Sequence, residues 1–135
     1  MYQAGINRAL QQYHHADLAE ISEADPHRLI QMLLEGALQR IAIARGAMQQ
    51  GDITVKGERL SSALSIIEGL RIHLDRERGG EIAANLDALY DYIQQRLLQA
   101  NLRNDVEILD EATALLRQIK AGWDGIAPHK ATPDP

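Results

Sequence analysis

The chain has 135 residues, enough for one domain with a single hydrophobic core. Its 14 basic and 19 acidic residues give a net charge of −5, which disfavours a nucleic-acid partner. The absence of cysteine excludes disulfides, zinc fingers, iron–sulfur clusters and thiol catalysis. No apolar run is long enough to cross a bilayer or to form a secretory signal, so we expect no membrane insertion and a cytoplasmic location.

The first 24 residues form a mostly polar segment with a weak helical pattern. Ile6, Leu10 and Tyr13 follow helical spacing, which predicts a short helix. An isolated helix of this length is marginal in water, so it must dock on the rest of the protein or remain mobile.

The first long helix is predicted between Asp25 and Gly51. Asp is a favoured N-cap, and the following Pro26 suits the first helical position. Gly51 is suited to the left-handed conformation that ends many helices. Between these caps, apolar residues recur in steps of three and four, as on one face of a helix. This core stripe comprises Ile30, Leu33, Leu34, Ala37, Ile41, Ala44 and Met48.

Three further helices follow after short connections. The second is predicted over about 53–77 and the third over 80–102. The fourth begins after Asn104, which together with Glu107 has the form of a capping box. Each helix carries one apolar stripe. The stripe residues are Leu60, Ala63, Ile67, Leu70 and Leu74, then Ile82, Leu86, Leu89, Ile93, Leu97 and Ala100, then Leu109, Ala112, Leu116, Ile119 and Trp123.

These elements predict an all-α fold, an antiparallel up-down four-helix bundle with a short extra N-terminal helix or lid. The expected organisation is an N-terminal segment at 1–24, the bundle at 25–125 and a disordered, Pro-rich tail at 126–135.

No constellation of residues points to catalysis, a metal or a cofactor. None of the five histidines has Glu three residues before it, as a di-iron bundle requires. No serine lies in a strand–turn–helix elbow, and no glycine-rich phosphate loop is present. We therefore predict that the chain is not an enzyme and uses no cofactor or metal.

Apolar residues outside the four stripes leave two interpretations open. They either fill a wide core or a homodimer seam, or they line a long groove between helices that takes an amphipathic partner segment. The spacing of the stripes does not decide between the two.

Several short motifs follow one another along the chain: YQ at 2–3, DPHRLI at 25–30, ML at 32–33, GA at 36–37, GD at 51–52, GGEIA at 79–83, NLD at 85–87, LYDY at 89–92, LLQAN at 97–101 and DVEIL at 105–109, followed by Trp123. In their order and spacing, these motifs resemble the FliS family of flagellar export chaperones over nearly the whole chain. One departure is LEG at 34–36, where the family often has Tyr-Asp-Gly.

The resemblance implies an antiparallel four-helix bundle with an extra N-terminal segment and without catalysis or a cofactor. It implies a cytoplasmic chaperone that binds the otherwise disordered C-terminal segment of flagellin, prevents premature polymerisation and helps delivery to the type III export gate. It also implies that the N-terminal segment lies over the flagellin groove in the free protein.

On this basis we nominate a client groove from residues that lie off the core stripes. Two asparagines are included because their amides are placed to hydrogen-bond a client backbone. The nominated groove residues are Val55, Leu64, Ile66, Ile72, Asn85, Tyr90, Leu98, Asn101, Ile108 and Leu115. The nominated lid residues are Tyr2, Ile6, Leu10 and Tyr13.

A second functional hypothesis is a self-associating helical-bundle adaptor or regulatory protein. The same apolar surplus would then form a homodimer when no client is bound. Contacts with export-gate components through a second face are compatible with either hypothesis.

Overall fold

The computed structural model describes residues 25–126 as four α-helices, and this range contains no strand. The prediction of an all-α helical bundle is confirmed. The nominated N-terminal helix and the tail after Ile126 lie outside the described residues, so the expected domain boundaries stay a prediction. The helices are α3 (Pro26–Gln50), α4 (Ile53–Ile72), α5 (Arg76–Arg103) and α6 (Val106–Asp124).

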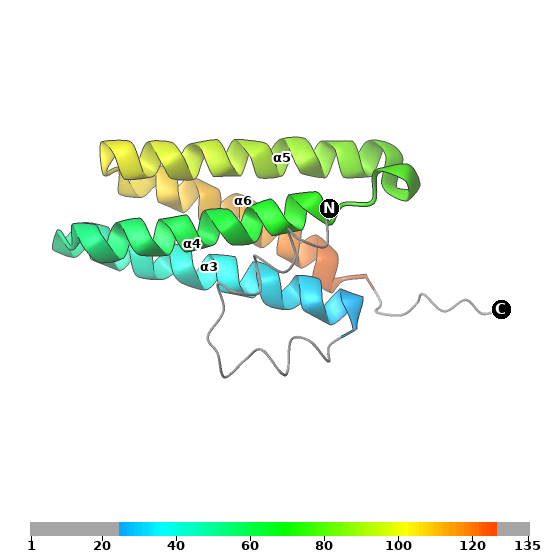
Figure 1. The fold of residues 1–135 in the computed structure, drawn as a ribbon, viewed down its shortest axis with the longest axis horizontal. Helices are drawn as coiled ribbons and strands as arrows, with labels where there is room; N and C mark the ends of the chain where they lie inside the picture. The colour runs from blue at the N-terminus through cyan, green and yellow to red at the C-terminus, as the bar shows by residue number, and fades with distance from the viewer. Residues whose placement is uncertain (1–24, 127–135) are drawn as a thin grey trace.

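The four helices pack side by side as a closed ring. The neighbouring pairs are α3 with α4, α4 with α5, α5 with α6, and α6 with α3, which places α4 and α6 on a diagonal. Figure 1 shows that consecutive helices run antiparallel. Consequently α3 and α5 begin at the same end of the bundle at which α4 and α6 end. None of the four helices combines the length and the apolar character needed to cross a bilayer.

An aspartate caps the start of every described helix, which explains where each one begins. Asp25 Oδ1 accepts a hydrogen bond from the Arg28 amide at 2.7 Å, and Asp52 and Asp75 cap α4 and α5 in the same manner. Asp105 caps α6 by accepting from the amide of Glu107, two residues on. Such a cap stabilises a helix by about 1 kcal/mol. Each start is therefore encoded locally.

Two boundaries differ from the sequence prediction. Asn104 does not cap α6; it ends α5 in the left-handed conformation at φ 54°, which Asn tolerates, and Asp105 caps α6 instead. The second helix ends at Ile72 rather than near residue 77, because Asp75 begins a new helical turn.

The core contains the predicted stripes and also residues outside them. Ile66, Tyr90 and Ile108 were nominated as groove residues, yet all three are buried in the central cluster, with Ile66 at 0% exposure. A helix in a ring contacts two neighbours, so its buried face is wider than one stripe. In contrast, Ile82 was predicted in the core and is 72% exposed.

A guanidinium clamp holds α4 against α5. Arg71 donates two hydrogen bonds to Asp87, at 2.8 and 3.3 Å, and one to Gln94 at 2.8 Å. It also pairs with Asp91 at 3.2 Å. The hydrogen bonds from Arg71, and to a lesser extent the one from Arg76, lower the pKa of Asp87 below its ordinary value. The clamp lies close to the end of the bundle at which α5 begins.

Candidate functional site

An apolar pocket of about 910 Å³ opens at the end of the bundle where α3 and α5 begin. Its size falls within the range of sites that bind ligands or peptide side chains. Besides the phenol of Tyr90 and the indole of Trp123, the polar side chains that line it are those of Asp25, His27, His73, Asp75 and Gln118. The apolar side chains come from all four helices and comprise Ile30, Leu34, Leu70, Leu74, Ile82, Leu86, Tyr90, Ile119 and Trp123, with Ile126 after α6.

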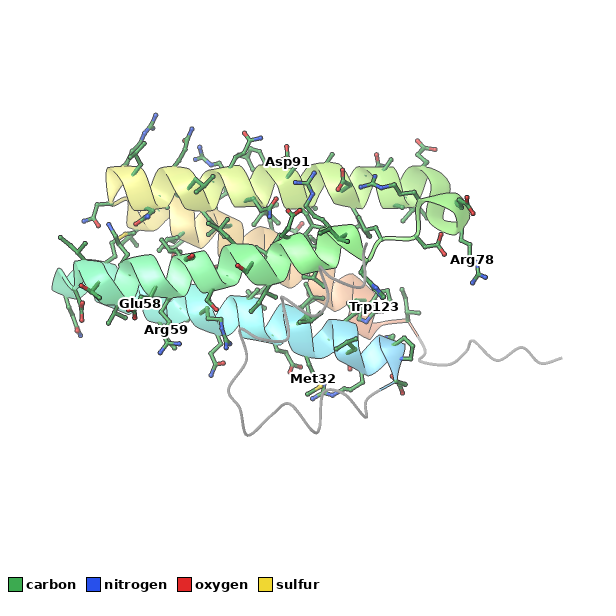
Figure 2. The ribbon with its side chains drawn as sticks, viewed as in Figure 1. Met32, Glu58, Arg59, Arg78, Asp91 and Trp123 are labelled. Atoms are coloured by element: carbon green, nitrogen blue, oxygen red, sulfur yellow. The ribbon has the colours of Figure 1, made fainter. Side chains whose placement is uncertain are left out.

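His27 and Trp123 form one wall of the pocket and join the start of α3 to the end of α6. Their rings stack with centroids 5.0 Å apart. Trp123 Nε1 donates to the His27 carbonyl at 3.0 Å, and His27 Nε2 donates to the Trp123 carbonyl at the same distance. Figure 2 shows Trp123 at this end of the bundle. Since a carbonyl only accepts, the geometry places a proton on Nε2 of His27.

Ile82 is the most exposed of the large apolar residues that line the pocket. It lines the cavity, yet 72% of its surface is exposed, against 52% for Ile126. It lies two residues after Gly80, where the backbone of α5 departs from helical geometry. Exposed apolar surface that continues into a large cavity is typical of a site for another polypeptide segment.

Tyr90 is a buried residue that also lines the pocket. Tyr90 is 3% exposed, and burial raises the pKa of its phenol to about 12. The ring therefore stays neutral at any physiological pH and adds apolar surface to the cavity. Its place in the site differs from the exposed role that we nominated for it.

His73 gives the pocket a titratable group. Burial lowers the pKa of its imidazole below the ordinary value. Between the folded and the unfolded pKa the unfolded chain binds more protons, so stability is complete above the unfolded pKa and is lost as pH falls through this window. We expect urea unfolding to show a lower stability at about pH 5.5 than at about pH 7.5. His73→Gln should flatten this dependence, and an unchanged slope in that variant would contradict the assignment.

A second apolar surface lies on the α4–α5 side at the opposite end of the bundle. Leu98 and Leu102 are one helical turn apart on α5 and are 55% and 86% exposed. Ile53, at the start of α4, is 74% exposed. The two helix ends are adjacent, because Lys56 Nζ donates to the Asn101 carbonyl at 3.2 Å and to Asn104 Oδ1 at 2.9 Å.

The nominated groove residues do not form one continuous site. Leu98 and Asn85 are exposed, and the remaining half-buried members come from different sides of the ring. Those of α4 and α5 share a face, whereas Leu115 belongs to α6, which is diagonal to α4. The half-buried members are Val55, Leu64, Ile72, Asn101 and Leu115. Their role in binding stays a prediction, as does that of the lid residues, which lie outside the described range.

The end pocket was not predicted, because most of its apolar lining residues have the spacing of core residues. Ile30, Leu70 and Trp123 belong to the ends of three different stripes, and only the fold brings those ends together. A usable signal was the Gly79–Gly80 pair beside an apolar stripe, since it marks a place where the chain turns away from the core.

The family described as "Flagellar protein FliS" matches residues 7–130. The flagellar secretion chaperone FliSB of Pseudomonas aeruginosa is 52% identical over 121 residues, which cover 89% of this chain and 96% of that protein.

Two other flagellar secretion chaperones are also similar to the chain. The flagellar secretion chaperone FliS of Vibrio cholerae is 49% identical, covering 82% of each chain. That of Salmonella typhimurium is 50% identical, covering 80% of this chain and 81% of its own. Such coverage spans the whole bundle, so the resemblance inferred from the motifs is confirmed. The chain belongs to the FliS family of flagellar secretion chaperones, which are not enzymes.

Proposed function

We propose that the protein acts in the cytoplasm as the chaperone of flagellin. It binds the C-terminal segment of flagellin, which is disordered when free, prevents its premature polymerisation and supports its export by the flagellar type III system. The observation that carries this proposal is the end pocket, an apolar cavity with an uncovered Ile82 in its wall. Membership of the FliS family supplies the class of client.

The two apolar surfaces suit a long client. In the straight part of α5 after Gly80, the pocket residue Ile82 and the exposed Leu102 are 20 residues apart, which is about 30 Å at 1.5 Å per residue. A segment that folds on binding loses conformational entropy, so it needs a large contact area to reach useful affinity. A segment that follows the bundle from one surface to the other meets that requirement.

Co-expression tests the proposal directly. Full-length flagellin should co-purify with the chain at one to one, and flagellin without its C-terminal segment should not. Retention of the truncated client would contradict the choice of segment. Light scattering on the same samples addresses the self-associating alternative, since a tight homodimer that persists with flagellin present would favour that reading.

Leu98→Asp is expected to weaken flagellin binding by about 10-fold, because it removes one exposed apolar anchor worth about 1.5 kcal/mol or more. Leu98 is not in the core, so unfolding should be unaffected. Gln99→Asp adds the same charge at the next exposed position and should bind as wild type. Equal affinities for both variants, measured by titration calorimetry, would remove this face from the binding site.

We further propose that residues 1–24 act as a lid. Tyr2, Ile6, Leu10 and Tyr13 supply its apolar side chains, and the segment joins the bundle at Asp25, itself a residue of the pocket. Deletion of residues 1–17 should speed or tighten flagellin binding. Stopped-flow association measures this, with deletion of residues 130–135 as the control truncation. Identical rates and affinities in the two truncations would refute autoinhibition.

A further inference from the structure

The first turn of α5 is separated from the rest of that helix by a glycine hinge. Gly80 has φ 50° and ψ −123°, a combination open only to glycine. Gly79 allows the chain to pass close to the helix, because a Cβ there would lie 2.8 Å from the Ala83 Cβ. The turn before the hinge is held by a helical backbone bond, in which the Gly79 amide donates to the Asp75 carbonyl at 2.8 Å, and by its cap, in which Asp75 Oδ1 accepts from the Arg78 amide at 3.1 Å.

This turn forms part of the rim of the end pocket. Leu74, Asp75 and Gly79 line the cavity on one side of the hinge, and Ile82 lines it on the other. Figure 1 shows the turn projecting at the end of α5 beyond the straight part of the helix. A rotation at Gly80 therefore changes how far the pocket is covered, and Ile82 is the apolar residue left open in the present position.

One ion pair spans the hinge. Arg76, on the turn, pairs with Asp87 on the straight part of α5 at 3.0 Å. The Arg76 side chain is 58% exposed, and an exposed ion pair contributes little stability, so it is easily broken. Arg78 offers the contrast. Its only ion pair in the described chain is with Asp75 on the same side of the hinge, at 3.7 Å, and Figure 2 shows its side chain directed away from the bundle.

We propose that residues 74–80 form a flap that rotates at Gly80 and closes over the segment bound in the end pocket, with the Arg76–Asp87 pair holding it open in the free protein. This inference rests on the proposed function for the identity of the occupant, the C-terminal segment of flagellin. Apolar side chains of the bound segment would contact both Leu74 and Ile82. This contact outweighs the weak Arg76–Asp87 pair, which breaks when the flap closes.

Spin labels test the flap, and the chain suits them because it has no native cysteine. Labels at Glu77→Cys and Arg117→Cys report the distance from flap to α6, and labels at Gln95→Cys and Arg117→Cys report a distance that the hinge does not change. On addition of a flagellin C-terminal peptide, the first distance should shorten while the second stays constant. An unchanged first distance with peptide bound would overturn the flap and leave the proposed function standing.

A second spin-label experiment uses the free protein and needs no client. Arg76→Ala should broaden or shorten the 77–117 distance distribution, whereas Arg78→Ala should leave it as in wild type. If the Arg76→Ala distribution is identical to that of wild type, the Arg76–Asp87 pair does not hold the flap open. This outcome is independent of peptide binding. A failure of the peptide to bind would instead contradict the proposed function.

Kinetics give a second, independent readout. Gly80→Ala should speed peptide dissociation by about 10-fold, since Ala resists this backbone geometry and displaces the flap. Gly57→Ala is the matched control, because its Cβ meets open space in the helix. Equal dissociation rates in the two variants would count against the flap.

Discussion

Ile82→Asp is expected to weaken flagellin binding by at least about 10-fold while the bundle stays folded. Burying an Ile side chain stabilises a complex by about 1.5–3 kcal/mol, and each 1.4 kcal/mol corresponds to a factor of ten in affinity. The substitution also places a carboxylate in an apolar cavity, which adds a desolvation penalty. The native fold is spared, because Ile82 is 72% exposed in the free protein.

Ile43→Asp is the control for this experiment. Ile43 is another exposed isoleucine, at 39% exposure, so the same substitution changes the same residue type. It lies on α3 and belongs neither to the pocket nor to the surface formed by Ile53, Leu98 and Leu102. Titration calorimetry with the flagellin C-terminal segment should show a loss for Ile82→Asp that greatly exceeds any loss for Ile43→Asp. Comparable losses in the two variants would mean that exposed apolar area in general, rather than the end pocket, binds the client.

The helices themselves were predictable because their signals are local. Asp25, Pro26 and Gly51 mark the ends of α3 through caps that act within a few residues, and the structure uses all three as predicted. The misassigned boundary at Asn104 has the same cause. Both Asn104 and Asp105 are suitable capping residues, and which of them caps α6 depends on how α5 ends.

The site was less predictable because it depends on how the helices are placed relative to one another. Ile30, Leu70 and Trp123 are far apart in sequence, and each has the spacing of an ordinary core residue. They line a cavity because four stripes converge at an end that no further side chain of the described bundle fills. The pattern of a single helix contains no signal for such a gap.

Apolar residues outside the predicted stripes thus do not by themselves identify a binding surface. Ile66 and Leu98 both lie off the predicted stripes, yet one is sealed in the core and the other is 55% exposed. The difference comes from the ring arrangement. Side chains turned toward either neighbouring helix are buried, and only those turned outward remain for a partner.

Ile66→Ala provides the sharpest test of this account, with an expected loss of about 2–5 kcal/mol in the free energy of unfolding. The substitution deletes three carbons from a fully buried side chain and leaves a cavity in the centre of the bundle. Ile53→Ala makes the same change at the exposed start of the same helix and should stay within about 0.5 kcal/mol of wild type. Urea denaturation measures the free energy of unfolding of both variants, which are compared at equal slopes of that free energy against urea concentration.

The two outcomes separate a structural role for Ile66 from a client-binding role. If Ile66 lay on a binding surface, its truncation would weaken flagellin binding and leave unfolding unchanged. With the packing described here, stability falls first, and affinity at a temperature where the variant is fully folded remains close to wild type. Because a domain of this size is stabilised by only about 5–15 kcal/mol in total, a loss of this magnitude is readily measured. The end pocket, rather than the buried face of α4, then remains the proposed site for a client segment.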